Sequence, residues 1–340
     1  MGVCDDRTPA GDDGRVTHAE MAFPLWDQHV CLPLLVGTSV DPLARYAQQS
    51  GSIVSVNVGY EPQRLADVRA LLESFRDQIG TDPRFRLCAT SDDIEACFGI
   101  GRIGVVFDLE DSGPLDGDLD NLAVFHDLGV RSLVPTYNHA NAAGSGCLDS
   151  DDTGLSRYGR DLVNRMNALG MIPDGSHSSP RTGLDMCRHS SRPVVYSHSN
   201  LRGVWEHPRN LTDDQARACA DTGGVVGITG VGIFLGPNTA TVDAMLTQID
   251  YAVELVGIDH VGLGSDYPFD ADDFARELTD NPNLFPDDYT RWGPIAFMPP
   301  EATMDIGAAL IRHGYSRDDV AAITHRNVAR VHRADSRAFR

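Results

Sequence analysis

Residues 154–177 read GLSRYGRDLVNRMNALGMIPDGSH, and this stretch predicts a helix followed by a buried strand. Residues 155–170 have a helical pattern that stops at a glycine, as helices commonly do. A short apolar run follows at 170–177 and ends at His177. A helix that alternates with a buried strand is the building unit of α/β proteins with a parallel sheet.

Apolar runs of this kind recur along the chain, and each ends in polar or small residues. The eight runs are 22–30, 52–60, 102–111, 131–138, 170–177, 192–199, 223–230 and 260–266. Most are apolar on both faces, which is typical of strands buried in a parallel sheet. Helical patterns lie between them, at 62–79, 119–129, 155–170, 211–224, 240–257 and 301–333. Thr212 is the expected N-cap of the fourth helix.

Eight strands that alternate with helices over about 240 residues predict a (β/α)8 TIM barrel. A doubly wound open sheet is the structural alternative. No GxGxxG motif follows an early strand and no Walker motif occurs, so the common nucleotide-binding folds have no support. We expect a flexible N-terminal segment at 1–20 and one barrel domain at 21–335. The long stretches 138–154 and 267–299 are expected to shape a substrate pocket.

Charge and cysteine content narrow the classes of partner and compartment. The 340 residues include 49 acidic and 28 basic side chains, and the formal net charge of −21 argues against nucleic-acid or anionic-membrane partners. The seven cysteines form no CxxC pair, which suits free thiols in a reducing cytoplasm. The first 20 residues are polar, and no apolar run is long enough to span a membrane. We therefore expect a cytoplasmic protein.

Several of the predicted strands end in residues that commonly bind metals. These residues are His29, Cys31, Asp108, Glu110, Asp111, His177, His198 and Asp266. The carboxyl ends of barrel strands converge on one mouth, where residues distant in sequence meet. Histidines with bridging carboxylates suit a hydrolase centre with one or two metal ions. Simpler interpretations are a hydrogen-bonded pocket histidine, a helix cap for Asp266 and a small buried hydrophobe for Cys31. The coincidence at five strand ends favours the metal site.

Several motifs resemble those of a known family. DQHVCLP at 27–33 resembles the DGHNDLP opening of the renal or membrane dipeptidase family, a group of zinc peptidases with a (β/α)8 barrel. Residues 154–177 resemble its most specific segment, GLTxFGxxvVxxMNxLGmxvDxSH. Further similar segments follow in order: FDLED at 107–111, LVPTYNHAN at 133–141, PVVYSHSN at 193–200, HPRN at 207–210 and GLGSDYPFD at 262–270.

The resemblance implies a role for each matching residue. Glu110 would bridge two zinc ions, His177 and His198 would hold one ion, and His29 with Asp266 would hold the other. Asp266 would also accept a proton from the attacking water and pass it to the leaving amine.

Substrate binding is also implied by the resemblance. Arg209, followed by Asn210, would grip the terminal carboxylate of the substrate, a bidentate task that suits a guanidinium. Tyr137 stands where the family has a histidine that polarises the scissile carbonyl, and its phenol can donate a hydrogen bond to the oxyanion.

The sequence departs from the family at two further places. Cys31 occupies the position of a ligand aspartate, so either a thiolate binds the zinc or that metal is weak or lost. Asp111 and Ser112 replace two glycines after the bridging glutamate, and we expect them to add charge and bulk to the pocket.

The resemblance thus implies a zinc-dependent hydrolase that cleaves a dipeptide or a small amino-acid amide. It would hold one or two Zn2+ ions per chain, and we expect two. The nearest alternative is an amidohydrolase acting on a non-peptide amide, such as an N-acyl amino acid or a lactam. The other alternative is a non-catalytic barrel that has lost a metal through Cys31. A homodimer is also expected from the resemblance.

Overall fold

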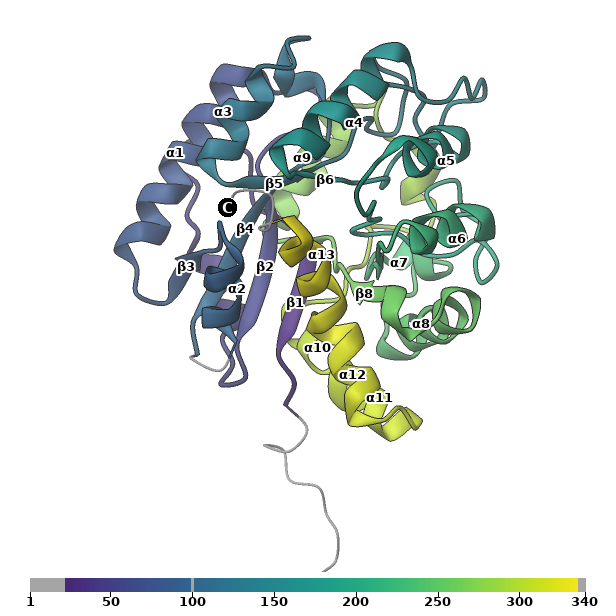
Figure 1. Ribbon diagram of the computed structural model, residues 1–340. Helices are drawn as coiled ribbons and strands as arrows, with labels where there is room; N and C mark the ends of the chain where they lie inside the picture. Colours follow the sequence, from purple (N-terminus) through teal and green to yellow (C-terminus); the bar gives the residue numbers. More distant parts are fainter. Residues whose placement is uncertain (1–21, 99–100, 336–340) are drawn as a thin grey trace, which may run out of the picture.

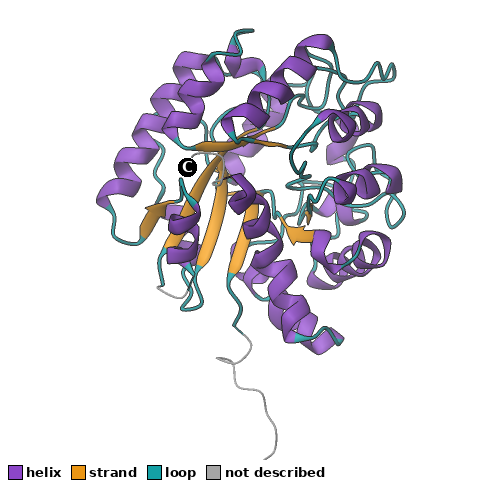
Figure 2. Cartoon of the chain, in the orientation of Figure 1, coloured by secondary structure: helices purple, strands orange, loops and turns teal. Residues whose placement is uncertain are grey.

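The computed structural model describes residues 22–98 and 101–335, and the predicted flexible segment 1–20 lies outside these residues. Within them a curled sheet is surrounded by helices (Figures 1 and 2). The strands are β1 (Leu25–Cys31), β2 (Ser52–Asn57), β3 (Phe85–Leu87), β4 (Ile103–Leu109), β5 (Val130–Leu133), β6 (Ile172–Pro173), β7 (Val226–Ile228), β8 (Val261–Leu263) and β9 (Tyr267–Pro268).

The order of the strands confirms the predicted barrel. Neighbouring strands run β6-β5-β4-β2-β1-β8-β7, and all of these pairs are parallel. The sixth apolar run joins the two ends of this path, because Asp174 bridges Val195 and Tyr196 bridges Val226, both in parallel. The sheet therefore curls round on itself, and the doubly wound open sheet is wrong.

Close backbone packing accompanies this junction. Gly227 and Gly264 both lie against the sixth run, and a Cβ atom on either would lie 2.0 Å from the carbonyl oxygen of Ser197. Every residue of β2 and β4 is buried, as expected for strands covered on both faces. The missing side chains at the two glycines leave room for the backbone that carries His198.

The helices follow the predicted alternation. They are α1 (Leu65–Thr81), α2 (Ser91–Cys97), α3 (Asn121–Leu128), α4 (Arg157–Leu169), α5 (Pro180–His189), α6 (Asp213–Asp221), α7 (Gly232–Leu235), α8 (Val242–Val256), α9 (Ala271–Asp280), α10 (Pro300–Met304), α11 (Ile306–His313), α12 (Arg317–Ala321) and α13 (Asn327–Asp335). Thr212 caps α6 as predicted, since its side chain accepts a hydrogen bond from the amide of Gln215.

The C-terminal helical pattern at 301–333 is more broken than its periodicity suggests. Gly314, with φ of 110°, ends α11, and Ser316 starts α12 by capping it. A π-helical turn at Ala322–Arg326 separates α12 from α13. Residues 317–335 therefore form one continuous helical stretch through the π-helical turn, and Gly314 separates it from α11.

Two further expectations concern the described residues as a whole. No helix within 22–98 and 101–335 is both long and apolar enough to cross a membrane. The six cysteines in this part of the chain are free thiols, and Cys4 lies outside it.

Candidate metal centre

The strand ends bring the six predicted metal ligands into one cluster. β1 carries His29 and Cys31, and Glu110 directly follows β4. His177 and Asp266 follow β6 and β8, and His198 lies near the end of the sixth run. Potential ligand atoms lie within 4.8 Å of one another in three groups: His29, Cys31 and Glu110; His29, His198 and Asp266; and Glu110, His177 and His198.

Glu110 lies at the centre of this cluster. Its Oε1 atom is 2.8 Å from Nε2 of His177, 3.2 Å from Nε2 of His198 and 3.4 Å from Nε2 of His29. The carboxylate is only 5% exposed. Three imidazole nitrogens directed at one buried carboxylate oxygen form a donor set that fits zinc, which binds nitrogen and oxygen ligands in this way.

The other nitrogen of each imidazole is held by a neighbouring polar group. The Nδ1 contacts are His29 with Asp108 Oδ1 (3.1 Å), His177 with Asn138 Oδ1 (2.8 Å) and His198 with Ser197 Oγ (2.7 Å). Such outer contacts orient an imidazole and leave its opposite nitrogen for a metal. The amide of Asn138 donates to the Leu284 carbonyl, so its oxygen faces His177.

Asn57 holds the second oxygen of Glu110. It ends β2, and its Nδ2 donates to Oε2 of Glu110 at 2.6 Å. Its own Oδ1 accepts a hydrogen bond from the amide of Gly59 at 2.8 Å, which fixes the orientation of the side-chain amide. Sequence reasoning missed Asn57, although a polar residue at the end of the buried run SIVSVN was a usable signal.

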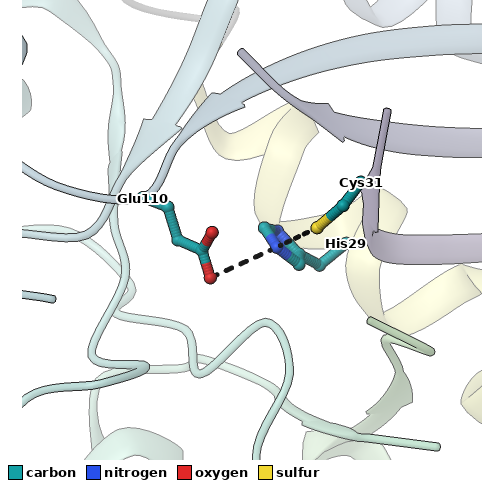
Figure 3. A group of neighbouring side chains, drawn as sticks. All are labelled: His29, Cys31 and Glu110. Atoms are coloured by element: carbon teal, nitrogen blue, oxygen red, sulfur yellow. Dashed lines mark hydrogen bonds and ion pairs between the residues drawn. The ribbon is translucent and has the colours of Figure 1, made fainter. Parts of the chain in front are cut away.

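Cys31 lies on the same side of the cluster as His29. Its Sγ is 3.5 Å from Nε2 of His29 and 3.8 Å from Oδ1 of Asp266. Figure 3 shows the thiol, the imidazole and the carboxylate of Glu110 directed into one space. Burial raises the pKa of the Cys31 thiol to about 12. A metal that binds this sulfur must therefore displace a proton.

Burial and mutual contacts shift the pKa values of the other ionisable groups of the centre. Burial raises the pKa of Asp266 to about 7 despite the opposing charge of His29. Burial also favours the neutral form of Glu110, but His29 and the hydrogen bonds from His177 and His198 outweigh it and hold the pKa of Glu110 well below its usual value. Burial, together with Arg209, lowers the pKa of His177 to about 3. His177 is therefore neutral near pH 7, as metal binding requires.

Three residues of the centre have a left-handed backbone. The φ angles are 62° for His177, 57° for Asp266 and 57° for Asn138. A side chain in this region costs of order 1–3 kcal/mol, and such strain concentrates at functional sites. Surrounding contacts therefore hold these side chains in place against a local backbone preference.

Arg209 lies behind His177. It is 2% exposed, its Nε lies 3.1 Å from His177 Nδ1, and its Nη1 and Nη2 atoms donate to Ser199 Oγ (3.1 Å) and the His198 carbonyl (3.2 Å). Asn210 is buried as well, and its amide donates to two backbone carbonyls. Neither residue is among those that line the cavity beside the cluster, so their contact with a substrate stays a prediction.

Tyr137 does line that cavity, and its ring stacks on His177 with a centroid distance of 4.2 Å. The expectation for Asp111 and Ser112 is corrected, because neither lines the cavity. Asp111 instead accepts hydrogen bonds from the amide of Tyr137 and the side chain of Asn141. Ser112 donates to a backbone carbonyl. Both are buried, and they support the backbone that carries Tyr137.

The cavity opens on the metal cluster and has an aromatic wall. Its lining includes Cys31, Glu110, His177 and Asp266. The stretch 267–299 supplies many of the other lining residues, as predicted, with Phe274, Phe285, Tyr289 and Phe297 among them. Stretch 138–154 contributes Asn138.

Several known proteins are similar to this chain in sequence or in fold. An uncharacterized protein from the pqqA 5′ region of Klebsiella pneumoniae is 39% identical over 208 residues, which cover 58% of this chain and 76% of that protein. An uncharacterized dipeptidase of Schizosaccharomyces pombe is 32% identical over 252 residues, 73% of this chain but 57% of its own length. The solved structure of an amidohydrolase from Pseudomonas aeruginosa has the same fold, with a TM-score of 0.81, 24% identity and coverage of 94% of this chain and 98% of that one.

A family profile also matches most of the chain. The profile of the membrane dipeptidase family (peptidase family M19) matches residues 30–285. This range includes Cys31, Glu110, His177, His198 and Asp266, and His29 directly precedes it. The match extends over more than half of the sequence, so the chain belongs to the membrane dipeptidase family.

Proposed function

We propose that this protein is a zinc-dependent hydrolase that cleaves the amide bond of a dipeptide or of a small amino-acid amide. The observation that carries the proposal is the convergence of three imidazole Nε2 atoms on Oε1 of Glu110. Membership in the membrane dipeptidase family supports the reaction class. The aromatic cavity beside the cluster has room for a small organic substrate.

Two zinc ions suit the donor set. Glu110 would bridge them, with His177 and His198 on one ion and His29, Cys31 and Asp266 on the other. Imidazole nitrogen, thiolate sulfur and carboxylate oxygen are all ordinary zinc ligands. When bound, zinc ions activate water for attack and polarise the scissile carbonyl.

The residues of the chain supply proton transfer and orientation. Asp266 would take the proton of the attacking water and deliver it to the leaving amine. Tyr137, at the cavity wall beside His177, would donate a hydrogen bond from its phenol to the developing oxyanion. Arg209 would bind the substrate carboxylate. Three of its N–H groups already contact described residues, and a guanidinium has five.

A matched set of substrates tests the proposal. The set contains a dipeptide, its C-terminal amide, an N-acyl amino acid and a lactam, each assayed with zinc-loaded and chelator-treated protein. We expect zinc-dependent hydrolysis of the dipeptide. Arg209→Ala should lower kcat/KM for the free dipeptide by about 10- to 100-fold more than for its amide, since a hydrogen bond to a charged group contributes about 1.5–3 kcal/mol. Arg217→Ala, an exposed change on α6, is the control.

Other outcomes point to the alternatives. Hydrolysis of the N-acyl amino acid or lactam without the dipeptide would favour a non-peptide amidohydrolase. An absence of hydrolysis together with incomplete metal binding would favour a non-catalytic barrel. We also propose a cytoplasmic location, supported by the free thiols of the described residues. The expected homodimer is tested by light scattering of the purified protein.

A further inference from the structure

We propose that Asp108 is a positioning residue that makes the two metal positions of this centre unequal. The inference rests on the proposed function, because it concerns how the chain holds the metals. Asp108 backs the imidazole of His29 with a carboxylate. Neither of the other two imidazoles is backed by a carboxylate: Nδ1 of His177 faces the amide oxygen of Asn138 and the guanidinium of Arg209, and Nδ1 of His198 faces the hydroxyl of Ser197.

The location of Asp108 fixes its geometry. It lies on β4, two residues before Glu110, and pairs in register with Asn57 on β2 and Ser132 on β5. Its carbonyl accepts a hydrogen bond from the amide of Val58 at 3.0 Å. A residue held by strands on both sides cannot shift freely, so the 3.1 Å contact between its Oδ1 and Nδ1 of His29 is built into the sheet.

The second carboxylate oxygen of Asp108 shows how strongly this side chain depends on His29. Asp108 is 5% exposed, and its Oδ2 has no hydrogen-bond partner among the described residues. A buried carboxylate without full compensation is costly. A cation bound to Nε2 of His29 compensates it, because the charge of the metal acts through the ring on the carboxylate behind it.

The consequence differs between the two sides of the cluster. A carboxylate behind an imidazole makes its metal-binding nitrogen a stronger donor, whereas an amide or a hydroxyl mainly orients the ring. Asp108 lies behind His29, which shares its side of the cluster with Cys31. The affinity of the ion beside His29 and Cys31 should therefore depend on Asp108. The affinity of the ion beside His177 should not.

The experiment compares Asp108→Asn with Ser197→Ala, which removes the matching outer contact of His198. Metal-free protein is titrated with Co2+ against a chelating dye, and the two dissociation constants are determined. The absorption band of a cobalt–thiolate bond identifies the ion next to Cys31. We expect Asp108→Asn to lower the affinity for one ion about 10- to 100-fold, the usual effect of losing an outer carboxylate. The weakened ion should be the one that gives the thiolate band, and Ser197→Ala should leave that ion unchanged.

The two dissociation constants show whether Asp108 makes the metal positions unequal. If Asp108→Asn leaves both constants unchanged, the inference is wrong, and a lower melting temperature of the metal-free variant with unchanged constants would assign Asp108 a structural role only. An equal loss of affinity for both ions would also overturn the inference. If Asp108→Asn does not fold, Asp108→Ser is measured in its place. Wild-type protein that binds no metal would instead overturn the proposed function, so the two failures are distinguishable.

Discussion

Sγ of Cys31 lies 3.5 Å from Nε2 of His29, on the side of the cluster that also holds Asp266. The thiol therefore stands within reach of any ion that His29 binds. A zinc ion accepts sulfur as readily as oxygen, and thiolate donors favour softer metals than carboxylates do. Cys31 is the residue that separates this centre most clearly from one built only of nitrogen and oxygen.

Replacing Cys31 tests this assignment. We expect two zinc ions per chain in the wild type, about one in Cys31→Ala and two in Cys31→Asp, because a carboxylate can take the place of the thiolate. Cys31→Asp should also bind Mn2+ better than the wild type does, since a harder donor favours a harder ion. Mass spectrometry of metals after gel filtration gives the counts. Equal zinc content in all three proteins would show that Cys31 is a neighbour of the ions and not a ligand.

Asn57→Ala should leave the carboxylate of Glu110 less firmly oriented and so weaken metal binding. The change removes the 2.6 Å hydrogen bond to Oε2 of Glu110 and leaves that buried oxygen without this partner. We expect metal affinity to fall by about 10-fold or more, as is typical for the loss of an outer contact. Ser55→Ala is the matched control on β2, since it removes the hydrogen bond from Trp26 without touching Glu110. If both variants lose stability and keep full metal affinity, Asn57 has no role in the centre.

The barrel was predictable because burial on both faces leaves a strong pattern in the sequence. Each of the eight predicted runs contributes to the sheet, yet run 192–199 forms only bridges at Val195 and Tyr196. The sequence could not show this, because pairing length depends on how neighbouring strands are staggered. β3, at Phe85–Leu87, was missed because Arg86 interrupts it and no continuous apolar run is left.

The candidate site also has residues that the sequence reveals and residues that it does not. Histidines and acids at strand ends were recognisable, because their chemistry is distinctive and the barrel brings strand ends together. The supporting contacts of Asn57, Asn138 and Ser197 were not, since such residues are common in loops and their role depends on side-chain direction. Asp111 shows the same limit, because its carboxylate bonds to the amide of Tyr137 and does not enter the cavity.

Gly264, which directly follows β8, lies against the backbone next to His198, and Gly264→Ala should displace that histidine. The added Cβ would lie 2.0 Å from the carbonyl oxygen of Ser197, a backbone atom that cannot move without His198. We expect a loss of about 1–3 kcal/mol in the free energy of unfolding, as for other overpacked sites, together with weaker metal binding. Urea unfolding and metal titration measure the two effects. Gly257→Ala is a poor control because of its positive φ, whereas Gly80→Ala on α1 has open space around it.

Normal metal affinity in a destabilised Gly264→Ala variant would contradict this prediction. It would show that the backbone can absorb the clash without displacing His198.

His207 should make the stability of the protein fall in mild acid. Its ring is 7% exposed, and Nδ1 accepts a hydrogen bond from the amide of Arg209 at 3.1 Å. Burial, with the charges of Arg209, Arg291 and Arg202, lowers the pKa of His207 to about 4. Between pH 6.5 and 4 the imidazole of His207 is therefore protonated in the unfolded chain but neutral in the native protein. The free energy of unfolding decreases as the pH falls through this range. At pH 5 the contribution is about 2 kcal/mol.

His207→Asn isolates this contribution, because the amide oxygen of asparagine can still accept the hydrogen bond from Arg209 but takes up no proton. Urea unfolding of both proteins is measured at pH 7.5, 6 and 5 in the presence of a chelator, so that metal release does not add to the pH effect. Between pH 7.5 and 5 the wild type should lose about 2 kcal/mol more than the variant. Parallel losses in the two proteins would mean that His207 takes up its proton in the native state, and that the fold tolerates a charged imidazole beside Arg209.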